Sequence, residues 1–78
     1  MNEQKLKQIF AETFELPVEK VEDDLKYNSI ERWDSIGHMS LIAALDDAFD
    51  TMLETEDVLD LSSFKKAKEI LAKYGVSF

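Results

Sequence analysis

Apolar residues in three stretches of this sequence recur at intervals of three and four positions, and the strict two-residue alternation of a half-buried strand is absent. Intervals of three and four place side chains on one face of an α-helix. Only two glycines and one proline interrupt the chain. Its 78 residues allow one domain, over 1–78, with one modest core. The sequence therefore predicts an all-α fold, a small four-helix bundle of three longer helices and one short helix.

The first predicted helix covers Asn2 to about Phe14, and its apolar face carries Leu6, Ile9, Phe10 and Phe14. It ends before Pro17, because the residue preceding a proline is disfavoured in the helical conformation. A long loop then connects the first and second helices over residues 15–34. We expect this loop to wrap around the bundle, since it carries regularly placed apolar anchors: Val18, Val21, Leu25, Ile30 and Trp33.

The second predicted helix begins at Asp34-Ser35, where the Asp34 carboxylate is suited to accept amide hydrogens of the first turn. Its predicted core face consists of Met39, Ile42, Leu45 and Phe49. The same spacing places on the outer side or its edge Ile36, Ser40, Ala43, Asp47 and Asp50. Ile36 is thus expected to be exposed among acids, unless the helix rotates it into the core. We also assign Met52 and the phenylalanines to the core.

A short helical turn is predicted near Glu56 to Leu59. The last helix is predicted to follow Ser62-Ser63, which are good capping residues, and to run to about Tyr74, where Gly75 is a natural stop. The apolar stripe of this last helix consists of Phe64, Ala67, Ile70, Leu71 and Tyr74.

The formal net charge of −8 arises from one contiguous third of the chain. This acidic segment, residues 34–60, has no Lys or Arg and contains eight acids: Asp34, Asp46, Asp47, Asp50, Glu54, Glu56, Asp57 and Asp60. In the rest of the chain, nine acids and nine bases balance each other. Such a field repels nucleic acid and anionic membranes and attracts proteins with basic docking surfaces. The alternative is an acidic face that only keeps the protein in solution.

Several classes of site are excluded by residue content. There is no cysteine and only one histidine, which excludes disulfides, thiolate nucleophiles, zinc clusters and multi-histidine sites. The acidic segment lacks the glycine of a calcium-binding loop, and no glycine elbow surrounds a candidate hydrolase serine. The first residues lack a signal-peptide pattern, and no apolar run approaches the ~20 residues of a membrane span. We therefore expect a cytoplasmic monomer that binds no metal.

The segment from Glu31 to Met39 reads ERWDSIGHM. Asp-Ser followed by a large aliphatic residue, at the start of an amphipathic helix after a long loop, resembles the phosphopantetheine attachment motif of acyl carrier proteins. Leucine is usual at the third position, where this chain has Ile36. The resemblance extends over the whole chain, through Phe49 at the end of the second helix, the acidic segment and the last helix after two hydroxyl residues.

This resemblance implies that Ser35 is the attachment residue for 4′-phosphopantetheine from coenzyme A. The chain is then a carrier without catalytic residues of its own, and the thiol for thioester chemistry arrives with the cofactor. The implied partners are a phosphopantetheinyl transferase and acyl-loading, acyl-transfer or synthase enzymes of fatty acid, polyketide or specialised pathways. The positions that match the family's partner-binding surface are Asp34, Ile36, Asp47, Asp50, Glu54, Glu56 and Asp57.

Three neighbours of Ser35 have alternative roles. We expect Trp33 to fill the junction of loop and bundle rather than contact the pantetheine arm, and His38 to be simply exposed rather than to approach the phosphate. Gly37 is unfavourable in a helix and leaves room for the arm or a partner under one hypothesis. Two rival functions remain: an aminoacyl or peptidyl carrier, and a cofactor-free acidic interaction module.

Overall fold

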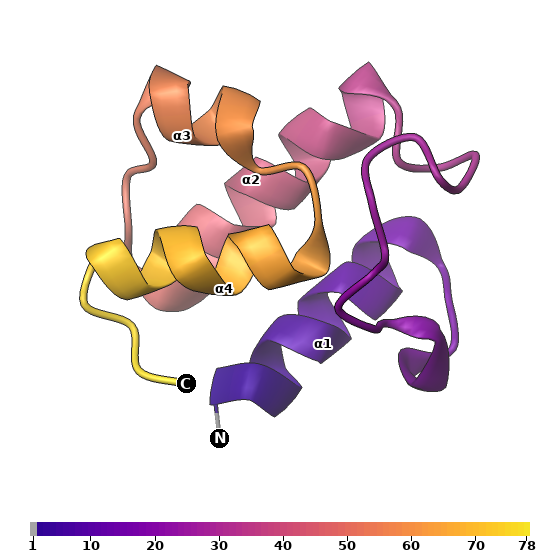
Figure 1. Cartoon of the computed structure of the whole chain (residues 1–78), viewed down its shortest axis with the longest axis horizontal. Helices are drawn as coiled ribbons and strands as arrows, with labels where there is room; N and C mark the ends of the chain where they lie inside the picture. The colour runs from indigo at the N-terminus through magenta and orange to yellow at the C-terminus, as the bar shows by residue number, and fades with distance from the viewer. Residues whose placement is uncertain (1) are drawn as a thin grey trace.

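The computed structural model describes residues 2–78 and contains four α-helices in that range. They are α1 (Asn2–Phe14), α2 (Ser35–Phe49), α3 (Thr55–Asp60) and α4 (Phe64–Lys73), with one 3-10 turn, η1 (Val18–Lys20), in the first loop. Helix α4 crosses in front of α2, α3 lies above them, and the long loop runs along one side (Figure 1). Residues 2–78 form no strand. The predicted all-α bundle with three longer helices and one short helix is confirmed.

The ends of α2 and α4 follow from local sequence. An Asp34 carboxylate oxygen accepts the Gly37 N–H at 2.8 Å, and the Ser63 hydroxyl accepts the Lys66 N–H at 3.0 Å. Both contacts satisfy first-turn amides that have no partner within the helix. Gly75 has a φ of 93° just beyond α4, a conformation that favours glycine. The predicted starts and stop of these helices are confirmed.

The last turn of α2 is closed by Asp46, an acid at the margin of the predicted core stripe. Its carboxylate accepts the Thr51 hydroxyl at 2.9 Å and the Leu53 N–H at 3.2 Å, while Asp50 adopts a left-handed conformation with a φ of 55°. Asp46 therefore fixes the turn that leads from α2 toward α3.

The indole of Trp33 lies at the centre of the core. It is fully buried, stacks on Phe14 at 5.1 Å between ring centroids, and meets the ring of Phe10 edge-on at 5.5 Å. The predicted role of Trp33 at the junction of loop and bundle is confirmed. The other buried apolar residues come from α1, α2, α4 and the loops: Leu6, Val21, Leu25, Leu41, Ile42, Leu45, Leu61, Phe64, Ala67, Ile70 and Leu71.

The core face of α2 is rotated from the predicted one. Leu41 is fully buried, whereas Met39 is 59% exposed, so the assignment of Met39 to the core is wrong. The reason is angular: at about 100° per residue, Met39 lies only ~60° around the helix from the exposed Ile36. Phe49 is half-buried.

Three other residues assigned to the interior are exposed. Met52 is 83% exposed in the link between α2 and α3, and Phe78 is 47% exposed beyond α4. Val18, predicted to anchor the loop, is 41% exposed because it begins the η1 turn at the surface. None of the three lies in an α-helix, so helical periodicity gave no information on their orientation.

The long loop is fastened to the start of α4. The Tyr27 N–H donates to the Ser62 carbonyl at 2.8 Å, the Phe64 N–H donates to the Leu25 carbonyl at 2.9 Å, and Lys26 and Ser63 form an isolated antiparallel bridge. These backbone contacts hold Tyr27 in a defined place next to the start of α2.

Gly37 is required by a close backbone approach. A Cβ atom at this position would lie 1.9 Å from the carbonyl oxygen of Arg32, which is far inside van der Waals contact. The first turn of α2 therefore packs directly against the residue that precedes Trp33. The space beside Gly37 on this side is filled by the chain itself, and it is not left for the arm or a partner.

We predict that Gly37→Ala destabilises the protein. In an unobstructed helix this change is stabilising by about 1 kcal/mol, but the clash with Arg32 should reverse the sign and cost about 1–3 kcal/mol. Urea unfolding followed by Trp33 fluorescence measures the difference. Ser40→Ala, at an exposed position of the same helix, is the control and should have a small effect. A more stable Gly37→Ala variant would contradict the close approach.

Candidate functional site

Ser35 is the first residue of α2, and its side chain is exposed. The preceding Asp34 is bonded on both sides: its carboxylate accepts the Gly37 N–H, and its carbonyl accepts the His38 N–H at 2.8 Å. The Ser35 hydroxyl oxygen lies 3.3 Å from the Tyr27 hydroxyl oxygen. The structure thus presents a hydroxyl group at the surface on a well-capped helix start.

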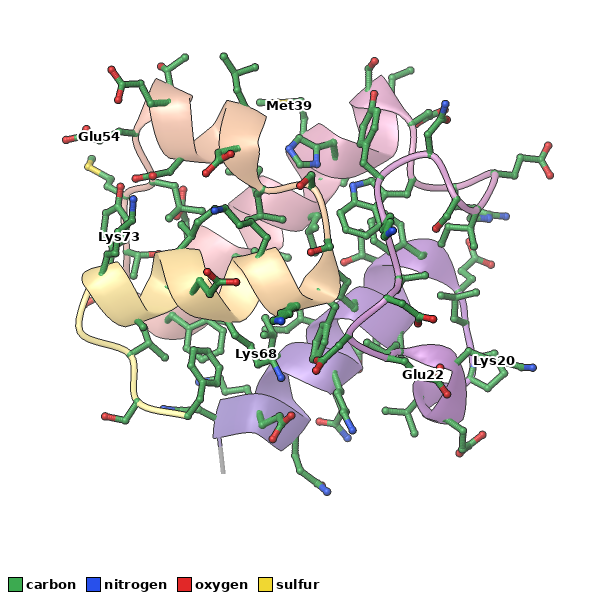
Figure 2. The ribbon with its side chains drawn as sticks, in the orientation of Figure 1. Lys20, Glu22, Met39, Glu54, Lys68 and Lys73 are labelled. Atoms are coloured by element: carbon green, nitrogen blue, oxygen red, sulfur yellow. The ribbon has the colours of Figure 1, made fainter. Side chains whose placement is uncertain are left out.

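A groove of about 400 Å³ opens beside Ser35, between α2 and α3. This volume lies within the range of small-molecule sites, about 300–1,000 Å³. Met39 stands at its outer edge near α3 (Figure 2). The lining is mostly apolar and comprises Tyr27, Ser35, His38, Met39, Val58, Leu59, Leu61 and Ser62.

His38 bridges the loop, α2 and α3. The Trp33 indole N–H donates to His38 Nδ1 at 2.9 Å, so Nδ1 is the acceptor nitrogen, and Nε2 carries the hydrogen and donates to the Val58 carbonyl at 2.7 Å. The ring is also stacked parallel to Trp33 at 6.3 Å and meets Tyr27 edge-on at 5.5 Å. The expectation of a simply exposed histidine is wrong, because both ring nitrogens are engaged within the fold.

Helix α3 forms one wall of the groove and is held by polar contacts. None of its six described residues is buried. At its start, the Asp57 carboxylate accepts the Tyr74 hydroxyl at 2.5 Å and the Lys73 ammonium at 2.7 Å, and the Glu54 N–H donates to the Tyr74 oxygen at 3.0 Å. Figure 2 shows Glu54 and Lys73 at the same end of the molecule. The His38 contact holds the wall on the side of α2.

The contact with Lys73 and, next, the Tyr74 hydroxyl hold the pKa of Asp57 below its ordinary value. The same carboxylate raises the pKa of Lys73 and of Tyr74. A lowered Asp pKa stabilises the fold above the unfolded value of about 3.9, and this contribution is lost as the pH falls through the folded-state pKa. Asp57 is therefore charged and engaged with α4 at neutral pH.

Of the predicted partner-binding residues, Asp57 is bonded within the fold and the others are exposed. Asp57 has both carboxylate oxygens bonded to residues at the end of α4. Ile36 is 79% exposed, which confirms its predicted outward position. Like Ile36, the remaining residues are exposed: Asp34, Asp47, Asp50, Glu54 and Glu56. On α2, Ile36 and Asp47 lie on the same side of the helix, because eleven residues make just over three full turns.

Sequence reasoning missed Tyr27 and Leu59 as residues next to Ser35. Tyr27 lies in an irregular loop, where spacing carries no information on which residue reaches the helix start. Leu59 was assigned to the short helix without a direction, and it is 79% exposed at the groove. No pattern in the sequence marks either residue. In the structure, the exposure of Leu59 suggests contact with a ligand or partner, since it is a large apolar residue outside the core.

The family model described as phosphopantetheine attachment site matches residues 4–71, which extend from α1 into α4. The chain belongs to this family. Its members carry a covalently attached 4′-phosphopantetheine group and work with phosphopantetheinyl transferases. An exposed hydroxyl beside a largely apolar groove fits such a group. A search of curated proteins found no match to the chain.

Within residues 2–78, no group of three or more His, Asp or Glu side chains is placed to hold a metal ion. Over the same range, no helix combines the length and apolar character needed to cross a bilayer.

We predict that His38→Phe lowers stability while retaining the aromatic packing. The variant keeps a ring beside Trp33 and Tyr27 but leaves the indole N–H and the Val58 carbonyl without partners, at a cost of about 1–3 kcal/mol. Urea unfolding measures the loss, and amide exchange should show faster opening of α3. Unchanged stability and exchange would show that the two hydrogen bonds do not hold α3.

Proposed function

We propose that this phosphopantetheine carrier is an acyl carrier protein in which Ser35 is the attachment residue. The observation that supports this most directly is an exposed Ser35 hydroxyl at the start of α2, in a chain whose residues 4–71 match the family. The Asp-Ser-Ile sequence around it corresponds to the attachment motif. Carrier domains of this family are not themselves catalytic.

In the modification reaction, the Ser35 oxygen attacks the phosphorus next to the pantetheine in coenzyme A. A new O–P bond forms, the bond from that phosphorus to the 3′,5′-ADP portion breaks, and a base of the transferase takes the serine proton. When attached, the arm supplies the thiol that this cysteine-free chain lacks, which permits thioester linkage of the cargo. The chain contributes an accessible hydroxyl on a rigid helix start.

The electrostatics of the helix start are mixed. The N-terminal end of α2 favours a phosphate through its partial positive charge. The adjacent Asp34 carboxylate opposes this by like-charge repulsion, although it is already bonded to the Gly37 N–H. We therefore propose a tethered arm rather than a phosphate enclosed by the protein.

The acidic surface around Ile36 is proposed to dock partner enzymes. Helices α2 and α3 carry no Lys or Arg. Ile36, which is 79% exposed, follows Asp34 at the start of α2, and the other exposed acids lie at the end of α2 and the start of α3. Such a surface attracts basic patches over a distance and leaves a small apolar contact for specificity. This favours rapid, reversible encounters of a monomeric carrier with several enzymes of acyl metabolism in the cytoplasm. The density of acids favours acyl over aminoacyl or peptidyl cargo.

The attachment is tested by incubating the protein with coenzyme A and a phosphopantetheinyl transferase, followed by intact-mass measurement. We predict that the wild type gains the mass of one arm and that Ser35→Ala gains none. Ser40→Ala, which removes an exposed hydroxyl from the same helix, should be modified as the wild type. If the wild type gains no mass, a cofactor-free interaction module replaces the carrier proposal.

We predict that Asp47→Lys with Asp50→Lys slows acyl transfer to partner enzymes by several-fold to about tenfold at low salt, because charge steering is reversed. The effect should shrink toward 1 M salt, where the screening length is about 3 Å. Stopped-flow or discontinuous transfer assays measure the rates. Glu12→Lys with Glu69→Lys changes the net charge equally on exposed positions of α1 and α4 and is the control. Equal slowing by both pairs would argue against a defined docking surface.

A further inference from the structure

Tyr27 is held rigidly next to Ser35 by elements that are far apart in sequence. Its ring meets the rings of His38 and Trp33 edge-on, at 5.5 and 6.3 Å between centroids. Its backbone N–H is bonded to the Ser62 carbonyl at 2.8 Å. These contacts fix the position of the Tyr27 ring. Its hydroxyl oxygen lies 3.3 Å from the Ser35 hydroxyl oxygen.

Several hydrogen-bond donors around Ser35 are already engaged. The Gly37 and His38 amides bond to Asp34. Both nitrogens of the His38 ring are in use. The sequence places no Lys or Arg from Asp34 to Asp60, so α2 and α3 offer no cationic side chain to a phosphate. Besides the first-turn amides of Ser35 and Ile36, which have no partner within the helix, the Tyr27 hydroxyl is a neutral side-chain donor at hydrogen-bond distance from the reacting oxygen.

The two sides of the helix start differ in chemistry. On one side lies the largely apolar groove, which Tyr27 and Ser35 both line. On the other side lies a second hollow, of about 450 Å³, lined by Asp34 and Glu31 and also by Arg32, whose guanidinium is paired with Glu15 at 2.6 Å. A phosphodiester carries one negative charge, so Asp34 and Glu31 repel it, while a phenol on the groove side attracts it.

We propose that Tyr27 is a positioning residue for the arm, and that its O–H donates a hydrogen bond to a non-bridging oxygen of the phosphodiester on Ser35. This inference rests on the proposed attachment at Ser35. Modification removes the serine proton and adds charged acceptors, so the neutral contact between two hydroxyls becomes a charge-assisted hydrogen bond. The bond holds the anchored end of the arm on the groove side of α2.

The test compares the ³¹P NMR spectra of the wild type, Tyr27→Phe and Ser40→Ala after enzymatic modification. We expect the phosphodiester resonance of the folded wild type to differ from that of the same protein unfolded in urea. In Tyr27→Phe the resonance should shift toward the unfolded value. Ser40→Ala, which removes an exposed hydroxyl that does not line the groove, should leave it in place.

A second measurement needs no variant. With ¹³Cζ-labelled tyrosine, the wild type gives two signals, because Tyr27 and Tyr74 are its only tyrosines. Modification should shift the Tyr27 signal and leave the Tyr74 signal unchanged. A wild-type phosphodiester resonance that is identical in Tyr27→Phe, or a Tyr27 signal that does not respond, overturns this inference alone. Absence of any phosphodiester resonance in the wild type overturns the attachment at Ser35 as well.

Discussion

The indole of Trp33 connects the long loop to the helices on either side of it. Its ring packs on Phe10 and Phe14 of α1, and its N–H donates to His38 of α2. Burial of so large a ring, with its one polar hydrogen bonded, fixes both the position and the rotation of the chain at this point. Two residues later the chain reaches the exposed Ser35. The core therefore orients the surface hydroxyl directly, through the start of α2.

One wall of the groove beside Ser35 is weakly packed, because a small domain has few large apolar side chains. Most large apolar side chains are used in the core, and α3 contributes no buried residue, so its place depends on His38, Tyr74 and Lys73. Individual hydrogen bonds in water contribute only about 0.5–1.5 kcal/mol each. Helix α2 is thus the rigid wall of the groove, and α3 is the wall that can move at low cost.

Much of the fold was predictable because it depends on local rules. Helical spacing, the caps at Asp34 and Ser63 and the stop at Gly75 determine where α2 and α4 begin and end. The outward direction of Ile36 followed from the same spacing. The choice of Leu41 over Met39 for the core did not, because both are apolar and only the packing against neighbouring helices separates them.

The details of the site depend on contacts that no local rule encodes. His38 reaches a carbonyl twenty residues away, and Tyr27 approaches Ser35 from an irregular loop. Gly37 packs against the backbone carbonyl of Arg32, and a contact with backbone cannot be read from the type of side chain. Each of these contacts became predictable only with the path of the loop known. The sequence indicated the family through Asp34-Ser35-Ile36, where the required residues are adjacent.

The measurement that tests the account most directly is intact-mass and fragment-ion analysis of the protein isolated from the cells that produce it. The account predicts a population that bears the arm on the peptide containing Ser35, part of it with a thioester-linked cargo whose mass identifies the pathway. Protein from growing cells with Ser35 unmodified throughout, or with the arm on another residue, would contradict it.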